Sequence, residues 1–315
     1  MQRPKISVIM LTYNRQELVG RAVESILNQT LNDFEFIIVD NGSTDTSGTI
    51  ADEYAAQDSR IHVIHRQRGN IGSGRNTGLD AATGEYIAFI DDDDYAEPDF
   101  LEFLYELAKT HGADIAVCGS NKEENGAVSP NHIYAYDELF IMDAVQSADA
   151  YLRRIRYNAA MPTKLIMREL FDKIRFSNTG SYDDISTTYR YFANAKTVAA
   201  HGVPKYTFYR HPGNNSSAAT KHHLLNPVQL REYLEAFRER TEYISGILPQ
   251  LADLALYSEW SYMISMVEKI HRYGLTTCDE PLAFMRRELR EHWNEFYNGI
   301  YTEGFEKEWM EKYVK

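Results

Sequence analysis

The sequence predicts an α/β protein with a mostly parallel central sheet, helices on both faces of that sheet and a C-terminal helical region. Apolar runs of strand length alternate with helical patterns over the first 120 residues, in units close to the length of a β–α–β unit. Polar clusters follow several of these runs, where open α/β sheets bind ligands. From Leu224 onward the pattern is helical and rich in aromatic residues, with prolines at helix starts or breaks.

The first half of the chain contains the clearest elements. Strands are expected at residues 6–11, 34–39, 61–64, 86–90 and 115–118, where short runs are rich in β-branched and aromatic residues. Helices are expected at residues 16–29, 50–55, 75–82 and 100–107, where apolar residues recur at helical spacing. We expect Asn14 to cap the first helix and residues 66–74 to form a glycine-containing loop.

The pattern is weaker after residue 120. We expect a loop at 121–130, a helix at 143–157, a strand at 161–167, a helix that begins at 182–184, and two last strands at 198–200 and 206–211. Pro212 to Thr220 is expected to be a flexible stretch.

Composition excludes several classes of function. The 315 residues include 33 Lys and Arg against 46 Asp and Glu, a formal net charge of −13, which makes the chain a poor nucleic-acid binder. Cys118 and Cys278 are far apart, which disfavours a disulfide framework or a zinc cluster and suits a reducing compartment. No stretch approaches about 18 uncharged apolar residues, the length that spans a membrane. We therefore expect a soluble, cytoplasmic protein.

Four consecutive aspartates, Asp91 to Asp94, follow the strand at 86–90. Adjacent carboxylates repel one another, so such a group is either fully solvated or binds a cation. At the carboxyl end of a central strand the second interpretation is favoured, and hard oxygen ligands suit Mg²⁺ or Mn²⁺. A solvated acidic turn is the alternative.

Two further polar clusters are predicted at the same edge of the sheet. Thr12-Tyr13 and Asp40-Asn41 each follow a strand, as Asp91 does. Because the carboxyl ends of parallel strands meet at one edge, the three clusters together predict a ligand site there.

Other ligand-binding folds lack their signatures in this sequence. A dinucleotide-binding oxidoreductase needs a glycine-rich turn after its first strand, whereas Thr12-Tyr13-Asn14 has no glycine. An aspartyl phosphatase needs an aspartate near the end of that strand, and none occurs before Asp33. The run at Asp91 also lacks the alternating acids and central glycine of an EF-hand.

Taken together, these stretches resemble family-2 glycosyltransferases with the GT-A fold, of the kind that assembles bacterial surface polysaccharides. The resemblance covers roughly residues 5–220 and rests on residues 7–15, 25–30, 39–45, 74–78 and 84–94, and later on 164–166, 182–184 and 208–210. It implies a GT-A domain at 1–222, with a nucleotide-sugar-binding half at 1–120 and an acceptor-binding half at 121–222. Residues 223–315 would form the C-terminal helical region.

The resemblance implies a set of donor-binding residues. Tyr13, beside Thr12, would lie against the nucleobase of a nucleoside-diphosphate sugar, usually uracil. Asp40, with Asn41 alongside, would accept a hydrogen bond from the base. Arg75 and Asn76 would contact the nucleotide or help to shape its pocket.

Asp91-x-Asp93 matches the DxD metal motif of that family. Asp91 would reach the ribose or the water shell of the metal, and Asp93 would bind the Mn²⁺ or Mg²⁺ that bridges the diphosphate. Asp92 holds the variable position within this donor-binding motif, and Asp94 would support the loop or cap the next helix. His211 could complete the metal shell or touch the diphosphate, and Arg210 could pair with a phosphate; a surface histidine is the alternative for His211.

The family is inverting and places its catalytic base in a Glu-Asp pair at the start of a helix. Tyr182-Asp183-Asp184 fits that position, although Asp183 replaces the glutamate. We assign Asp184 as the base and Asp183 as its rival. A pair of acids favoured by the dipole at the helix start is the alternative.

The expected function is therefore metal-dependent, inverting transfer of a hexose or N-acetylhexosamine from a UDP-sugar to a hydroxyl of a glycan acceptor. A lipid-linked oligosaccharide in capsule, exopolysaccharide or O-antigen synthesis is the expected acceptor. A non-catalytic nucleotide-sugar-binding or scaffold subunit is the alternative. The C-terminal helices are where we expect a homodimer contact or peripheral contact with the inner face of the plasma membrane.

Overall fold

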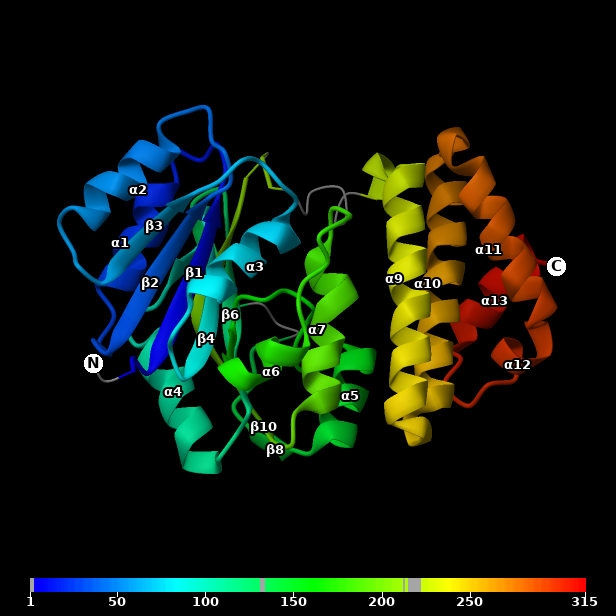
Figure 1. Cartoon of the computed structure of the whole chain (residues 1–315). Helices are drawn as coiled ribbons and strands as arrows, with labels where there is room; N and C mark the ends of the chain where they lie inside the picture. The colour runs from blue at the N-terminus through cyan, green and yellow to red at the C-terminus, as the bar shows by residue number, and fades with distance from the viewer. Residues whose placement is uncertain (1–2, 131–133, 212, 215–221) are drawn as a thin grey trace. The chain divides into compact units, whose positions relative to one another are not determined.

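The computed structural model describes residues 3–130, 134–211, 213–214 and 222–315 (Figure 1). Its contacts divide the chain into two compact units, Met1–Arg210 and His211–Lys315. The flexible stretch expected from Pro212 to Thr220 lies outside the described residues except for 213–214.

A single mixed sheet forms the centre of the first unit. Its spatial order is β3-β2-β1-β4-β9-β6-β10-β5, with β7 beside β6 and β8 beside β10. The strands are β1 Ile6–Thr12, β2 Phe34–Asp40, β3 Ile61–His65, β4 Tyr86–Asp91, β5 Tyr95–Ala96, β6 Ile115–Glu124, β7 Ala127–Pro130, β8 Leu139–Met142, β9 Lys164–Met167 and β10 Val198–Arg210. The parallel pairings, β1 with β2 and β4, β2 with β3, and β6 with β10, are the longest ladders and contain most of the paired residues of the sheet. The α/β prediction is confirmed.

Helices cover both faces of this sheet (Figure 1). They are α1 Val19–Leu27, α2 Ser47–Ala55, α3 Ile71–Ala81, α4 Phe100–His111, α5 Ala144–Arg153, α6 Arg168–Lys173 and α7 Asp183–Asn194. Side chains of β1 alternate between the two faces. Val8 and Met10 join the core that includes residues of α1 and α4.

The other face of β1 lies under α3. A Cβ atom at Gly78 would come within 2.5 Å of Ile9 Cγ2, and one at Gly74 within 2.3 Å of Leu11 Cδ1. Glycine at these two positions therefore lets α3 approach the sheet closely. Gly72 of α3 instead lies against Ser177, in the segment that leads into α7.

The register of the sheet brings the predicted polar clusters to one edge. Thr12 at the end of β1 pairs with Asp40 at the end of β2. On the other side of β1, Leu11 pairs with Asp91 at the end of β4. The ends of the three strands are thus adjacent, as the sequence predicts.

Several predictions after residue 120 are wrong. Residues 121–130 form a β-hairpin and no loop, because β6 continues to Glu124 and pairs with β7. The two last strands are one strand, β10, whose register shifts on either side of Pro204. The short elements β5, β8 and α6 are absent from the prediction. Polar hairpin strands and very short strands carry little apolar periodicity, so the sequence gives no signal for them.

Two helix boundaries in the first half also differ. The third helix begins at Ile71 because the Asn70 side chain accepts a hydrogen bond from the Ser73 N–H and caps it. Asn14 does not cap α1, which begins at Val19. The Asn14 side-chain oxygen instead accepts a hydrogen bond from the Thr44 N–H, in the turn after β2, at 2.8 Å.

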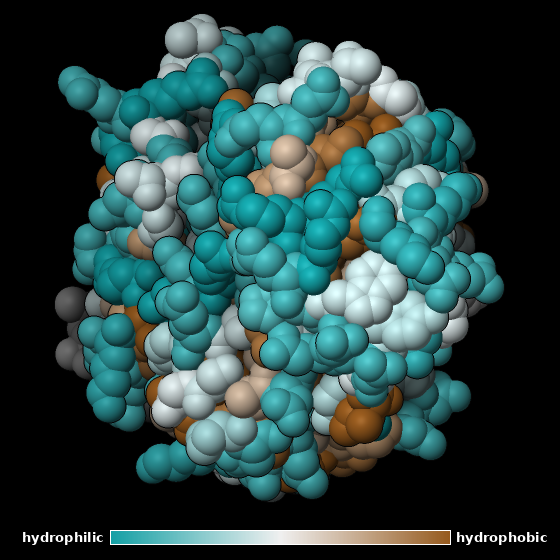
Figure 2. Space-filling view, turned by 90° about the vertical axis from the view of Figure 1, so that its right-hand side faces the viewer, coloured by the Kyte–Doolittle hydropathy of each residue, from teal (hydrophilic) through white to brown (hydrophobic). Residues whose placement is uncertain are grey.

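The second unit is helical. It contains α9 Pro227–Ile247, α10 Ala252–Tyr273, α11 Asp279–Glu291, α12 Trp293–Tyr297 and α13 Gly304–Tyr313, with short 3₁₀ turns between them. Aromatic side chains predicted there lie in or against its own core, for example Trp260 and Phe296. Figure 2 shows a mostly hydrophilic surface interrupted by separate apolar patches. Within the described residues, no helix has the length and apolar character that crossing a membrane requires.

Candidate active site

The turns after β1 and β2 are fixed to each other. The Thr12 carbonyl accepts a hydrogen bond from the Asn41 N–H at 2.9 Å. The Asn41 side chain then pairs with the backbone of Gly69, donating to its carbonyl at 2.9 Å and accepting from its N–H at 3.1 Å. Asn41 therefore fixes the loop that precedes α3.

Asp40 is buried at the end of β2, with 6% of its surface exposed. Its carboxylate accepts from the Ser43 N–H at 2.9 Å and lies 3.0 Å from His65 Nδ1. Burial acts to raise the pKa of Asp40, but the hydrogen bonds from Ser43 and His65 outweigh it and lower the pKa below its ordinary value. Asp40 is thus a preorganised anionic acceptor.

Tyr13 carries a cation on its ring. The guanidinium carbon of Arg68 lies 3.9 Å from the ring centroid. The Tyr13 N–H donates to Asp92 Oδ2 at 3.1 Å, which ties this turn to the aspartate run. Arg68 and His65 are absent from the residues predicted from the sequence. An arginine in a glycine-containing loop after a strand is the signal that could have identified Arg68.

Asp91 ends β4. Its side chain is 43% exposed, yet nearby protein atoms remove part of its hydration. This desolvation and repulsion from Asp93, Asp183 and Asp184 raise the pKa of Asp91 to about 6, while Arg75 acts in the opposite direction.

The next three aspartates have different surroundings. Burial and the charge of Asp93 raise the pKa of Asp92 to about 7. Arg15 Nε lies 3.7 Å from Asp92 Oδ1 and 3.9 Å from Asp93 Oδ2. Asp94 is buried and accepts from the Tyr206 hydroxyl at 2.9 Å and the Tyr209 N–H at 2.8 Å. Asp94 therefore holds the acidic loop against β10.

Arg75 joins the two halves of the site. Its Nη1 donates to Asp183 Oδ2 at 2.7 Å, and its Nη2 lies 3.4 Å from Asp91 Oδ1. Both Arg75 and Asp183 are buried, with 8% and 4% exposure. The structure therefore brings together carboxylates that lie about ninety residues apart in the sequence.

Asp184 is more accessible than Asp183. Its Oδ1 accepts from the Ile185 N–H at 2.8 Å. Burial and the neighbouring Asp183 raise the pKa of Asp184, with Arg75 opposing them. Because Arg75 is hydrogen-bonded to Asp183, Asp184 is the carboxylate of the pair that is better placed to accept a proton.

The aspartate run has the chemistry of a partial metal site. Asp91 and Asp93 offer hard oxygen atoms, and a divalent cation would offset the repulsion that, after burial, raises the pKa of Asp91. Among the described residues, no group of three His, Cys, Asp or Glu side chains is arranged to hold a metal ion alone. Such a pair fits Mg²⁺ or Mn²⁺, which protein sites hold with one or two carboxylates, water and substrate phosphates.

Three of the predicted residues have other contacts. The Asn76 side chain bonds to residues 176 and 178, in the segment before α7. Arg210 ends β10, with its guanidinium carbon 5.6 Å from the Phe208 ring centroid. His211 belongs to the second unit, where its N–H donates to Asn214 Oδ1 at 2.6 Å.

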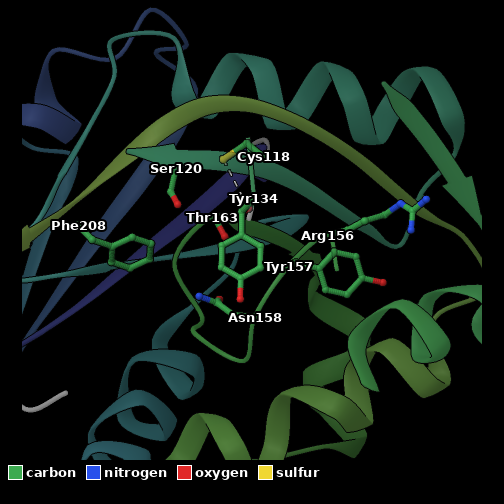
Figure 3. A pocket seen from close by; sticks show the side chains of 8 residues that line it. All are labelled: Cys118, Ser120, Tyr134, Arg156, Tyr157, Asn158, Thr163 and Phe208. Atoms are coloured by element: carbon green, nitrogen blue, oxygen red, sulfur yellow. Dashed lines mark hydrogen bonds between the residues drawn. The ribbon is translucent and has the colours of Figure 1, made fainter. Parts of the chain in front are cut away.

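A small hollow in the first unit does not coincide with these carboxylates (Figure 3). It is lined by Cys118, Ser120, Tyr134, Arg156, Tyr157, Asn158, Thr163 and Phe208. The hollow is too small to hold a water molecule. We therefore locate the site by the clustered carboxylates and their arginines.

Comparison with known proteins identifies the family of the chain. Residues 7–178 match the protein family described as Glycosyl transferase family 2, which is more than half of the chain. The chain belongs to this family. It is 31% identical to glycosyltransferase GlyG of Streptococcus pneumoniae over 217 residues, which cover 66% of this chain and 72% of GlyG. The protein is thus a glycosyltransferase.

Solved structures identify the fold of this glycosyltransferase. S. aureus TarS in complex with UDP-GlcNAc aligns with a TM-score of 0.64 and 21% identity, over 93% of this chain and 79% of that one. The mannosyltransferase PcManGT from Pyrobaculum calidifontis, in complex with GDP-Man and Mn²⁺, aligns with a TM-score of 0.55 and 16% identity, over 94% and 84%. The fold is GT-A.

Proposed function

We propose that this glycosyltransferase moves a hexose or N-acetylhexosamine from a UDP-sugar to a hydroxyl group of a glycan acceptor, with inversion at the anomeric carbon. The observation that carries the proposal is the bridge made by Arg75. It holds Asp183, and with it Asp184, beside Asp91 of the DxD motif. A proton acceptor and an acidic diphosphate-binding motif therefore share one site.

The donor would bind along the edge formed by β1, β2 and β4. In this proposal Tyr13 and Thr12 face the nucleobase, and Asp40 accepts a hydrogen bond from it with Asn41 alongside. The similarity to TarS in complex with UDP-GlcNAc supports UDP as the nucleotide. Asp91 and Asp93 would hold Mn²⁺ or Mg²⁺ against the diphosphate, with Arg210 as a further contact. The bound ion would stabilise the negative charge that develops on the leaving diphosphate.

Asp184 would act as the general base. It would take the proton from the acceptor hydroxyl as the hydroxyl oxygen bonds to the anomeric carbon. The bond between that carbon and the phosphate oxygen breaks, and UDP leaves on the opposite face of the sugar. Arg75 holds Asp183, which fixes the start of α7 and so the position of Asp184.

We propose a lipid-linked oligosaccharide as the acceptor, in a bacterial surface-polysaccharide pathway. Contact with a membrane or a second copy of the chain would then involve the C-terminal helices. Ile300 and Phe305 are 88% and 50% exposed there, which leaves apolar side chains for such contact. Flotation with vesicles of anionic phospholipid tests the membrane contact, and Ile300→Ser with Phe305→Ser should abolish any binding.

A donor screen tests the proposed function. We expect release of UDP from at least one of UDP-glucose, UDP-galactose, UDP-GlcNAc and UDP-GalNAc when Mn²⁺ is present. Activity should disappear in EDTA and return with added Mn²⁺ or Mg²⁺. Full activity in EDTA would contradict the metal assignment. UDP binding without turnover of any of the sugars would support a nucleotide-sugar-binding subunit instead.

A further inference from the structure

The segment that carries the candidate base has no regular structure of its own before α7. Residues 174–182 lie between α6 and α7, and Asp183 is the first residue of α7. A general base must lie within hydrogen-bond reach of the proton that it takes. The position of this segment therefore matters for catalysis, and its contacts show what fixes it.

Asn76 of α3 binds the backbone of this segment at Phe176. Its Nδ2 donates to the Phe176 carbonyl at 2.9 Å, and its Oδ1 accepts from the Phe176 N–H at 3.1 Å. The same Nδ2 lies 3.1 Å from Asn178 Oδ1. One amide side chain thus satisfies both backbone groups of a residue a hundred positions away.

Asn70, the residue that precedes α3, makes a second attachment. Its Oδ1 caps α3 by accepting from the Ser73 N–H at 2.9 Å. Its Nδ2 donates to the carbonyls of Ser177 and Gly180, at 3.1 and 3.2 Å. Asn70 therefore holds the start of α3 and the segment together.

Gly72 lies between these two asparagines. A Cβ atom there would lie 2.1 Å from the Ser177 carbonyl oxygen, which is much too close for any side chain. The segment consequently rests directly on the backbone of α3. Figure 1 shows α3 in cyan near the green segment that enters α7.

We propose that Asn70 and Asn76 are positioning residues for the catalytic base. They hold residues 176–180 on α3, and so set where Asp184 lies relative to the donor. Arg75 and Asn76 are neighbours in α3 and have different partners. Arg75 binds the Asp183 carboxylate, and Asn76 binds the backbone of Phe176, which precedes Asp183 in the chain. This inference rests on the proposed function, because it requires Asp184 to be the catalytic base. It gives Asn76 a role in positioning that base and not in binding the nucleotide.

Two variants and one control test the inference. Asn76→Ala removes the bonds to Phe176, while Asn70→Ser keeps a capping oxygen for α3 but is too short to reach Ser177 and Gly180. Thr77→Ala is the control, because the Thr77 hydroxyl donates to the Ser73 carbonyl within α3 and not to the segment. Turnover is measured as UDP release with Mn²⁺, and UDP affinity by titration calorimetry.

We expect kcat to fall by about 10- to 100-fold in Asn76→Ala and Asn70→Ser, because a small misplacement of a reacting group has effects of this order. The dissociation constant for UDP should stay within about twofold, and Thr77→Ala should match the wild type. Weaker UDP binding with unchanged kcat would overturn the inference and place Asn76 at the nucleotide.

Hydrogen exchange provides a readout that is independent of the donor. The Phe176 amide hydrogen should exchange faster in Asn76→Ala than in the wild type, because its acceptor has been removed. Unchanged exchange at residues 176–180 would contradict the attachment itself. A wild type without turnover would instead refute the proposed function, and the exchange experiment would then test only the attachment of residues 176–180 to α3. If Asn76→Ala does not fold, Asn70→Ser decides it.

Discussion

The two halves of the candidate site are held in place by different means. On the donor side, the ends of β1, β2 and β4 are placed by parallel backbone ladders, in which Thr12 pairs with Asp40 and Leu11 with Asp91. On the base side, Asp183 and Asp184 follow an irregular segment that the side chains of Asn70 and Asn76 hold on α3. A backbone ladder tolerates changes of side chain, whereas a side-chain attachment is lost with one substitution. We therefore expect the two halves to respond separately to mutation.

The largest effect is expected on the base side. Asp184→Asn should lower turnover of the UDP-sugar by about 10²- to 10⁴-fold, the usual contribution of a general base. The measurement is the rate of UDP release with Mn²⁺ present. Asp149→Asn is a matched control, because Asp149 forms a surface ion pair with Arg153 on α5. A greater loss in Asp183→Asn than in Asp184→Asn would exchange the roles of the two carboxylates.

On the donor side, Asp40→Ala should raise KM for the UDP-sugar by about 10- to 100-fold with little change in kcat. The reason is that a hydrogen bond to an ionised group contributes about 1.5–3 kcal/mol. Initial rates over a range of UDP-sugar concentrations separate the two constants. A fall in kcat at unchanged KM would show that Asp40 affects the chemical step and not donor binding. The donor side and the base side would then not respond separately to mutation.

Gly72→Ala is expected to have a smaller effect, confined to the base side. The added methyl group meets the Ser177 carbonyl, so the segment must move away from α3. We expect the free energy of unfolding to fall by about 1–3 kcal/mol, and kcat to fall by about tenfold. Urea unfolding and UDP release measure the two quantities.

The matched control for this variant is Gly246→Ala in α9, where a Cβ atom meets nothing within 4 Å. That substitution should stabilise the helix by about 0.5–1 kcal/mol. Equal stability changes in the two alanine variants would mean that the segment does not rest on α3.

The smallest effect concerns His65 on the donor side. Hydrogen bonds to Asp40 and Asp52 raise the pKa of His65, so the charged imidazole stabilises the fold. This stabilisation is complete below the ordinary pKa of 6.5 and is lost as the pH rises through the raised pKa. The difference in Tm between the wild type and His65→Gln should therefore shrink on going from pH 6 to pH 8. A Tm difference that grows from pH 6 to pH 8 would contradict the ion pairs of His65 with Asp40 and Asp52.

The same contrast explains which features the sequence predicts. The apolar runs of β1, β2 and β4 and the polar residues after them are visible in the sequence, and the register of the sheet follows from burial. The hairpin of β6 with β7 is polar and lacks that pattern, so it was missed. The attachment of Asn76 to Phe176 joins residues a hundred positions apart and leaves no periodic signal. The arrangement of the donor side can thus be predicted from local sequence patterns. The arrangement of the base side depends on contacts between distant residues, which the folded structure shows.

The most direct test of the separation between the two halves is the UDP affinity of Asp184→Asn. Titration calorimetry with UDP and Mn²⁺ should give a dissociation constant within about twofold of the wild type, although the variant has lost turnover. A loss of UDP binding in Asp184→Asn as large as that in Asp40→Ala would contradict the separation of the donor side from the base side.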